Sequence, residues 1–325
     1  MSTPLLEVED LHVWFDLEGG RELYAVQGIG FELAAGERLG LVGESGCGKT
    51  TAVLALMGLL PPTASVAGRV ILDGTDILSG GDETMRGHRW RDVAMVFQGA
   101  MNAFNPVRRI VDQIVEPMEL HGLAEGKAAR AQAQNLLELV GIPGRQGDRY
   151  PHEFSGGMRQ RAAIAMAIAC NPKVLLADEP TTALDVMIQA QVLELLVGLT
   201  KEFGLALVLV THDLPVVAQV CDRAAVMYAG KIVEAGPMDD LYHEPRHPYT
   251  RLLFAATPDL SGLGEVASIP GAPPRLDRRI AGCSFAPRCD VSFEPCPTVT
   301  PGTLSVGPGR VAACHRNDPS MRTAS

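Results

Sequence analysis

Lysine and threonine side chains end a glycine-rich segment whose composition suits the binding of a phosphate chain. The segment GESGCGKT occupies residues 43–50, directly after the apolar run 38–42 and directly before a helical run that starts at Thr51. Glycines allow successive backbone N–H groups to turn inward around an anion, and the following helix adds the positive end of its dipole. Lys49 would reach the β- and γ-phosphates of a nucleoside triphosphate, and the hydroxyl of Thr50 would join the shell of a bound Mg²⁺. A turn that merely connects a strand to a helix is the alternative, but a Lys-Thr pair at this offset favours a P-loop.

Two adjacent acids lie at the carboxyl end of a second predicted strand. The run VLLA at residues 174–177 is apolar without alternation, as expected for a parallel strand covered on both faces, and Asp178 and Glu179 follow it. Ligands bind at the carboxyl ends of strands in open α/β sheets, and neighbouring residues of a strand point to opposite sides. We therefore expect Asp178 to hold Mg²⁺ through water and Glu179 to act as the general base that polarises an attacking water. A solvated turn at the end of the strand is the alternative interpretation of the two acids.

A histidine follows the next apolar strand. The run at residues 205–210 ends in Thr-His-Asp, so His212 reaches the same edge of the predicted sheet. Asp213 is a good N-cap, and Pro215 suits the first turn of the following helix. Helix capping alone would explain this local sequence. His212 is a candidate for the site only because the other motifs occur in the same chain.

Six motifs in a fixed order give the chain a resemblance to a known family. They are GESGCGKT, Gln98 within MVFQGAMN, FSGGMRQR, LLADEP, Ala183-Leu184-Asp185 and His212. In this combination the sequence closely resembles the ATP-binding subunits of ABC transporters over residues 6 to about 255. Within that superfamily it is most similar to the subunits of bacterial dipeptide and oligopeptide importers, because of FSGGMRQR, HEPRHPYTRLLFAATP at residues 243–258 and a cysteine-bearing tail.

The resemblance implies a role for each residue of these motifs. An aromatic side chain would lie against adenine, with Phe15 as the first candidate and Tyr24 as the other, although both could equally be core residues. Gln98 would touch Mg²⁺ or the lytic water, and His212 would orient the γ-phosphate. Thr50, Gln98 and Asp178 are thus the expected Mg²⁺ ligands. The remaining contacts to the nucleotide are implied for Gly43, Glu44, Ser45, Gly46, Cys47, Gly48, Lys49, Thr50, Thr51, Ser155, Gly156, Gly157 and Asp185.

The same resemblance implies that one chain supplies only half of each ATP site. Residues 155–157 are similar to a signature that binds the γ-phosphate held by the opposite subunit, and Asp185 is similar to an aspartate that crosses the dimer interface. The chain departs from the usual signature at Phe154, where the family has Leu, and at Met158, where it has Gln. Neither change replaces the serine or the glycines, so we expect a competent signature.

The resemblance also implies the fold and the domains. The fold class is α/β: a P-loop NTPase core of the ABC type with an N-terminal antiparallel β part, an inserted helical subdomain and a small cysteine-bearing C-terminal extension. The nucleotide-binding domain would cover residues 1–255, with the helical subdomain at about 89–165, where residues 128–140 show helical spacing. The extension would cover residues 256–325 and contains a Pro/Gly-rich linker at 270–274.

Composition limits the possible cellular location and partners of the protein. The 325 residues, of which 46% are hydrophobic, can bury a large core. No apolar run approaches the roughly 20 residues that span a bilayer, and the polar N-terminus lacks a secretory signal. We therefore expect a peripheral protein held at the cytoplasmic face of the cell membrane by its partners. The formal net charge of −10 argues against general nucleic-acid binding, which needs a basic face.

Cysteines gather in the C-terminal extension. Four of the seven lie there, at Cys283, Cys289, Cys296 and Cys314. Disulfides are disfavoured in a cytosolic protein, so clustered thiols suggest a metal. Because Cys-x-x-Cys pairs are absent, zinc is the second choice, and a 4Fe–4S cluster is preferred since this tail resembles one that holds such a cluster in some peptide-importer subunits. Free thiols are the third possibility. The other three cysteines, Cys47, Cys170 and Cys221, are expected to serve as small apolar core residues.

The sequence therefore predicts an ATPase subunit, with ATP and Mg²⁺ as cofactors, that energises a binding-protein-dependent importer. Dipeptides or oligopeptides are the first choice of cargo, and nickel or oligosaccharides are the alternatives. The expected partners are a second, homologous ATP-binding subunit, two transmembrane permease subunits and an extracellular substrate-binding protein, without nucleic acid. A soluble ABC ATPase of translation or DNA repair is a remote alternative. The first type carries two ATPase units and the second a long coiled coil, and neither feature occurs in this sequence.

Overall fold

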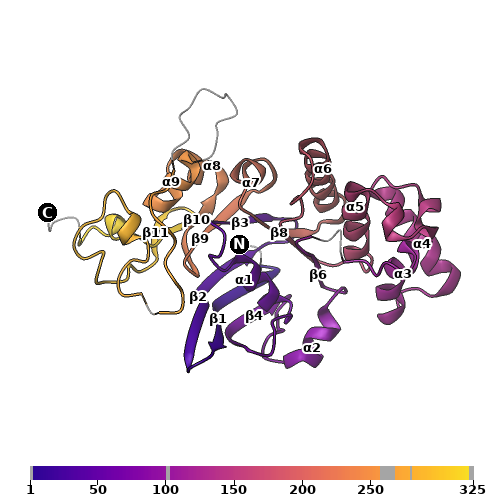
Figure 1. Cartoon of the computed structure of the whole chain (residues 1–325), viewed down its shortest axis with the longest axis horizontal. Helices are drawn as coiled ribbons and strands as arrows, with labels where there is room; N and C mark the ends of the chain where they lie inside the picture. Colours follow the sequence, from indigo (N-terminus) through magenta and orange to yellow (C-terminus); the bar gives the residue numbers. More distant parts are fainter. Residues whose placement is uncertain (1–2, 100–102, 257–267, 279, 322–325) are drawn as a thin grey trace. The chain divides into compact units, whose positions relative to one another are not determined.

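The computed structural model describes residues 3–99, 103–256, 268–278 and 280–321. The chain divides into two units, each assembled from separate stretches (Figure 1). We call the first the helical unit, made of Leu33–Arg38 and Gly80–Leu209 with the residues that precede Leu6. The second, the P-loop unit, is made of Leu6–Glu32, Leu39–Ser79 and the chain from Val210 onward.

An antiparallel sheet forms the N-terminal part of the P-loop unit, as the sequence predicts. Its strand order is β2-β1-β4-β5, with bounds β1 (Leu6–Leu17), β2 (Arg21–Leu33), β4 (Ala64–Leu72) and β5 (Thr75–Asp76). β1 pairs with β4 from Leu6 opposite Leu72 to Phe15 opposite Ala64. Its buried positions alternate over the first residues, which is the pattern of a strand with one covered face.

A second set of strands in the same unit carries the glycine-rich segment. β3 and β9 are parallel, β10 is antiparallel to β9, and β12 and β11 follow in antiparallel order. The strands are β3 (Arg38–Val42), β9 (Arg223–Tyr228), β10 (Lys231–Pro237), β11 (Leu304–Gly307) and β12 (Arg310–Ala312). The helices are α1 (Lys49–Leu56), α7 (Leu214–Val220), α8 (Met238–His243) and α9 (Pro248–Ala255). The C-terminal extension thus continues a sheet of the P-loop unit, because β12 pairs directly with β10. The last two residues of the 243–258 motif lie outside the described residues.

The helical unit contains three buried strands and most of the long helices. The strands are β6 (Val93–Val96), β7 (Val174–Asp178) and β8 (Ala206–Thr211), which begins in this unit. The helices are α2 (Gly81–His88), α3 (Ile110–Leu120), α4 (Gly126–Leu139), α5 (Gly156–Ala167) and α6 (Val186–Phe203). β6 and β7 are parallel, β8 neighbours β7, and every side chain of the three strands is buried. Burial on both faces explains why these runs are apolar without alternation. α3, α4 and α5 pack against one another (Figure 1).

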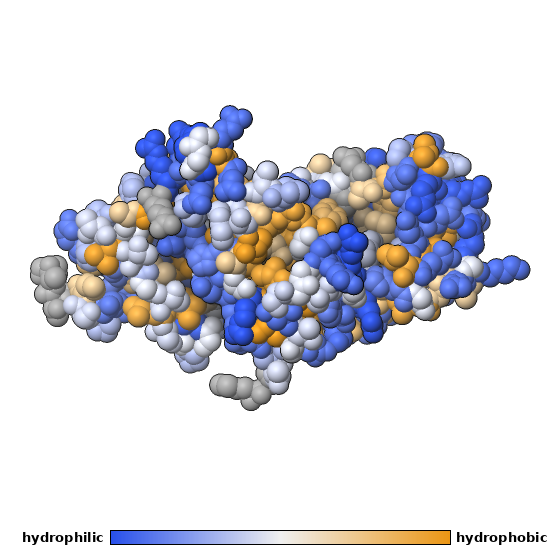
Figure 2. Space-filling view, turned by 90° about the horizontal axis from the view of Figure 1, so that it is seen from below, coloured by the Kyte–Doolittle hydropathy of each residue, from blue (hydrophilic) through white to orange (hydrophobic). Residues whose placement is uncertain are grey.

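The surface mixes polar and apolar residues. On the face drawn in Figure 2, hydrophilic residues cover much of the surface and hydrophobic ones gather in patches between them. Among the helices that the structure describes, none combines the length and the apolar character that a membrane crossing needs.

Candidate nucleotide site

The glycine-rich segment joins β3 to α1 as a tight loop that only glycine fits at two positions. A Cβ on Gly43 would lie 2.2 Å from the backbone oxygen of Met227, and a Cβ on Gly48 would lie 2.3 Å from that of Ala25. Both glycines also have positive φ angles, +150° and +104°. The missing side chains therefore let the loop press against β9 and β2, which leaves a backbone cradle of the kind that binds phosphate.

Lys49 opens α1 and is buried, with 6% of its surface exposed. Its ammonium donates to the backbone oxygens of Gly43 at 2.7 Å and Glu44 at 3.0 Å. The ammonium thus lies over the loop, where a phosphate chain would sit. The other predicted loop residues fall around it: Ser45, Gly46 and Thr50 are exposed, Glu44, Gly48 and Thr51 are half-buried, and Cys47 is buried.

The two predicted acids lie at the carboxyl end of β7 in the helical unit. Asp178 is the last strand residue and is 1% exposed, and Glu179 follows with a left-handed backbone, φ +44°. Oε2 of Glu179 accepts hydrogen bonds from Nε2 of Gln98 at 3.3 Å and from Oγ1 of Thr182 at 2.8 Å. The structure therefore brings Gln98 and Glu179 together, and it adds Thr182, which the sequence reasoning missed. The sequence feature that could have indicated Thr182 is its hydroxyl, three residues after Glu179.

The signature residues and the predicted interface aspartate both start helices. Ser155 caps α5 by accepting from the N–H of Met158 at 3.3 Å, and Asp185 caps α6 by accepting from the N–H of Ile188 at 3.0 Å. A Cβ on Gly157 would lie 2.7 Å from Cγ2 of Ile188, so the second glycine of the signature lets the starts of α5 and α6 approach. Ser155 and Asp185 are exposed, whereas Gly156 is half-buried in the first turn of α5.

His212 and the aromatic candidates belong to the P-loop unit. His212 is exposed after β8, and Asp213 caps α7 as predicted, with Pro215 in the first turn. Phe15 is half-buried on β1. Tyr24 is half-buried on β2, where its hydroxyl donates to Glu22 and its N–H pairs with Leu276 of the extension.

The iron–sulfur prediction is wrong. Cys283, Cys289, Cys296 and Cys314 all border one pocket, but no group of three or more His, Cys, Asp or Glu side chains in the described part of the chain has the arrangement of a metal site. All four are free thiols. Burial raises the pKa of Cys283 and Cys289, and that of Cys314 to about 11, which favours the neutral thiols. Of the three possibilities, the structure supports free thiols.

The three remaining cysteines behave as predicted. Cys47, Cys170 and Cys221 are 5–7% exposed and free. Burial raises the pKa of Cys170 to about 11, as expected for a small apolar core residue.

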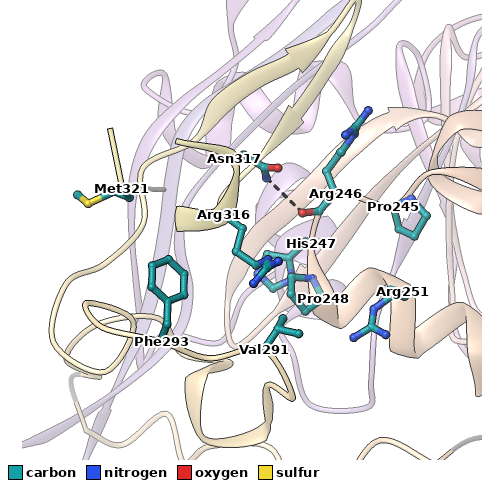
Figure 3. A pocket seen from close by; sticks show the side chains of 10 residues that line it. All are labelled: Pro245, Arg246, His247, Pro248, Arg251, Val291, Phe293, Arg316, Asn317 and Met321. Carbon is teal, nitrogen blue, oxygen red and sulfur yellow. Dashed lines mark hydrogen bonds between the residues drawn. The ribbon is translucent and has the colours of Figure 1, made fainter. Parts of the chain in front are cut away.

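A separate pocket of about 750 Å³ lies beside the start of α9 (Figure 3). Three arginines are among the residues that line it, Arg246, Arg251 and Arg316. Arg251 forms an ion pair with Asp290 at 2.6 Å, and Arg246 forms one with Glu244 at 3.0 Å. None of the predicted nucleotide residues lines this pocket, so we do not assign it to ATP.

Comparison with known proteins gives two family matches. Residues 26–182 match the family described as ABC transporter, and residues 233–296 match the C-terminal region of oligopeptide/dipeptide transporters. Dipeptide transport ATP-binding protein DppD of Bacillus subtilis is 46% identical over 320 residues, which are 97% of this chain and 95% of that protein. Oligopeptide transport ATP-binding protein OppD of Escherichia coli is 44% identical over 315 residues, 96% of this chain and 93% of that one.

A solved structure is also similar to this chain. The dimeric ATP-binding cassette MJ0796, in a post-hydrolysis state bound to ADP and Pi, superposes with a TM-score of 0.64 at 28% identity over 72% of this chain and 98% of the cassette. The phosphate loop and the buried strand that leads into Asp178 and Glu179 are features that the matched family would have. The matches to relatives also cover almost the whole chain. The chain therefore belongs to the family of ABC transporter ATP-binding proteins, enzymes that hydrolyse ATP, and within it to the members that carry the oligopeptide/dipeptide transporter C-terminal region.

Proposed function

We propose that the chain is the ATP-hydrolysing subunit of a binding-protein-dependent importer of dipeptides or oligopeptides. The names of its relatives and the match of residues 233–296 support the peptide cargo. The observation that carries the catalytic part is the hydrogen bond between Gln98 and Glu179, because it joins the two side chains expected to handle the attacking water.

Glu179 is the proposed general base. Thr182 and Gln98 donate to the same carboxylate oxygen, Oε2, and so fix the orientation of the carboxylate that would accept a proton from water. Such fixed orientation is the main way in which a protein can favour an in-line attack on a phosphoryl group.

ATP and Mg²⁺ would be held by the residues that the sequence predicts for them. The cradle left by Gly43 and Gly48, with the buried ammonium of Lys49, fits a phosphate chain. Thr50 and Asp178 supply the oxygen ligands that Mg²⁺ prefers, with Gln98 as the third candidate. When bound, the ion would neutralise charge that develops on the phosphate oxygens. Phe15, or Tyr24 in its place, would lie against adenine, and His212 would orient the γ-phosphate.

Each ATP would lie between two such subunits. Ser155 and the two following glycines would bind the γ-phosphate held by the second, homologous ATP-binding subunit, and Asp185 would cross that interface. The exposure of Ser155 and Asp185 at the starts of α5 and α6 is consistent with contacts to a partner. We assign the packed helices α3–α5 to the inserted helical subdomain, which would contact two permease subunits at the cytoplasmic face of the membrane.

Reconstitution tests this proposal. The chain would be co-expressed with its permease subunits and second ATP-binding subunit, purified as a complex and placed in proteoliposomes with the extracellular binding protein. ATP hydrolysis and uptake should rise when the binding protein carries a di- or oligopeptide. A complex that responds to nickel or to an oligosaccharide instead would overturn the peptide assignment, and a chain that does not assemble with permeases would overturn the importer assignment.

A further inference from the structure

Arg288 of the C-terminal extension contacts the phosphate loop. Its terminal nitrogens Nη1 and Nη2 donate to the two carboxylate oxygens of Glu44 at 2.7 and 2.9 Å, across 244 positions of sequence. The side chain of Arg288 is 5% exposed and that of Glu44 is 24% exposed. Two parallel hydrogen bonds in a largely shielded setting form the strongest and most directional kind of ion pair.

The arginine is itself held from several sides. Nε donates to the backbone oxygen of Pro270 at 2.7 Å, and Nη1 also donates to the hydroxyl of Tyr228 at 3.3 Å. The Cζ atom lies 5.7 Å from the ring centre of Tyr228 and 5.9 Å from that of Phe285. The guanidinium therefore has little freedom, and its charge is directed at Glu44.

The backbone of Glu44 is fixed by a second element. Its N–H donates to the hydroxyl of Tyr249 at 2.9 Å, and Tyr249 on α9 is fully buried. The ring of Tyr249 packs on those of Tyr228 and Phe285, with centroids 4.6 and 5.3 Å away. Side chain and backbone of this loop residue are thus both anchored in the region that follows β9.

A carboxylate in a phosphate loop opposes the function of the loop. Unpaired, Glu44 would repel a polyanionic ligand, and the repulsion would grow with each added phosphate. Paired with Arg288, the carboxylate is neutralised and held in one orientation. We propose that Arg288 is a positioning residue for nucleotide binding, through which the C-terminal extension sets the affinity of the loop for the phosphates of ATP. This inference rests on the proposed binding of ATP at the loop.

The test uses the full chain in three variants: Arg288→Gln, Glu44→Gln and the double change. Removing the arginine alone leaves an unpaired carboxylate beside the phosphates, so the Kd should rise by roughly tenfold for ATP, less for ADP and least for AMP. The rise should shrink at high salt, because salt screens charge repulsion. Adding Glu44→Gln to Arg288→Gln should restore most of the ATP affinity, since the repelling charge is gone.

A matched control breaks another ion pair of the extension. Arg251→Gln removes the contact with Asp290, at 2.6 and 2.7 Å, without touching the phosphate loop, and should leave all three Kd values unchanged. Thermal unfolding of each variant separates lost stability from lost affinity. If Arg288→Gln does not fold, Arg288→Lys, which keeps the charge but not the two parallel hydrogen bonds, is compared with the unaltered chain and should bind ATP less tightly.

The outcomes separate the two proposals. If the unaltered chain does not bind ATP, the proposed function fails. If it binds ATP while Arg288→Gln weakens ATP, ADP and AMP equally, or while the double change is as weak as Arg288→Gln alone, the arginine acts only on folding and the positioning role is overturned.

Discussion

The side-chain amide of Gln98 donates to Oε2 of Glu179 at 3.3 Å, which joins the segment after β6 to the end of β7. β6 and β7 are parallel neighbours, so their carboxyl ends meet at one edge of the sheet. Glu179 adopts φ +44°, a conformation that is uncommon for a residue with a side chain. Such backbone conformations concentrate at functional sites, where the surroundings hold them in place.

Glu179→Gln should abolish turnover without abolishing binding. The amide keeps the shape of the side chain but cannot accept a proton, so ATP hydrolysis by the assembled complex should fall by roughly 10²-fold or more. The Kd for ATP should stay within a few-fold of the unaltered value. Glu194→Gln on the exposed face of α6 is the control and should retain full hydrolysis. Near-normal turnover in Glu179→Gln would rule out the role of general base.

Thr182→Val should slow hydrolysis through Glu179. The hydroxyl of Thr182 lies 2.8 Å from Oε2 of Glu179, and valine removes this donor at nearly the same volume. Because a less well oriented base is a weaker catalyst, we expect kcat to fall by roughly three- to tenfold with KM little changed. Thr182→Ser keeps the hydroxyl and should recover most of the rate. If the serine and valine variants are equally slow, the hydroxyl does not orient the base.

Ser155→Arg should separate the two halves of the composite site. The change puts a bulky cation where the partner's γ-phosphate would lie, while the loop at residues 43–50 is untouched. It also removes the cap of α5, at a cost of about 1 kcal/mol, so the thermal unfolding of the variant must be measured alongside. ATP binding by the isolated chain should persist and hydrolysis by the assembled complex should not. Full hydrolysis in the complex would show that this signature does not act in trans.

The sequence predicted those strands and helix starts that depend on only a few neighbouring residues. The apolar run that precedes Asp178 is a buried strand, and Asp213 with Pro215 starts α7, because burial and capping act over a few residues. The glycines at 43 and 48 were predicted from phosphate binding alone, whereas the structure adds close approaches to Met227 and Ala25.

Contacts between distant residues were not predictable. Arg288 and Glu44 are 244 positions apart, and nothing near either residue indicates the other. The extension also continues a sheet through β12, which the Pro/Gly-rich composition near residues 270–274 did not suggest. The metal prediction failed for a related reason: cysteine spacing shows that thiols lie close in sequence, but ligation depends on how the thiols are arranged around one point in space, and the described residues hold no such arrangement.

Gly48→Ala should destabilise the protein more than Gly46→Ala. Both glycines have positive φ, +104° and +78°, so both substitutions carry a backbone penalty of about 1–3 kcal/mol. Only at Gly48 does the added Cβ meet an atom, the backbone oxygen of Ala25 at 2.3 Å; at Gly46 nothing lies within 4 Å. Urea unfolding should show the larger loss for Gly48→Ala, with β2 and the loop forced apart. Equal losses would mean that the close approach carries no cost.

His247 is 2% exposed at the N-terminus of α9. Its Nδ1 accepts from the N–H of Tyr249 at 3.0 Å, so the ring caps the helix in its neutral form. Burial lowers the pKa of His247 to about 3. In the unfolded chain the pKa returns to about 6.5, so the unfolded state binds more protons between these values. The stabilisation is complete above pH 6.5 and is lost as the pH falls toward 3.

His247→Asn tests this pH dependence, because asparagine keeps a capping oxygen and does not titrate. Between pH 7 and pH 5 the unaltered protein should lose about 2 kcal/mol more unfolding free energy than the variant, measured by urea unfolding at both pH values. Glu234 accepts from the N–H groups of Arg246 and His247, and burial raises its pKa, so its own contribution has the opposite sign. Both proteins retain Glu234, so its contribution cancels when the two are compared. The difference between their changes in unfolding free energy from pH 7 to pH 5 therefore gives the contribution of His247. If the unfolding free energies of the two proteins change equally between pH 7 and pH 5, His247 takes up no extra proton on unfolding.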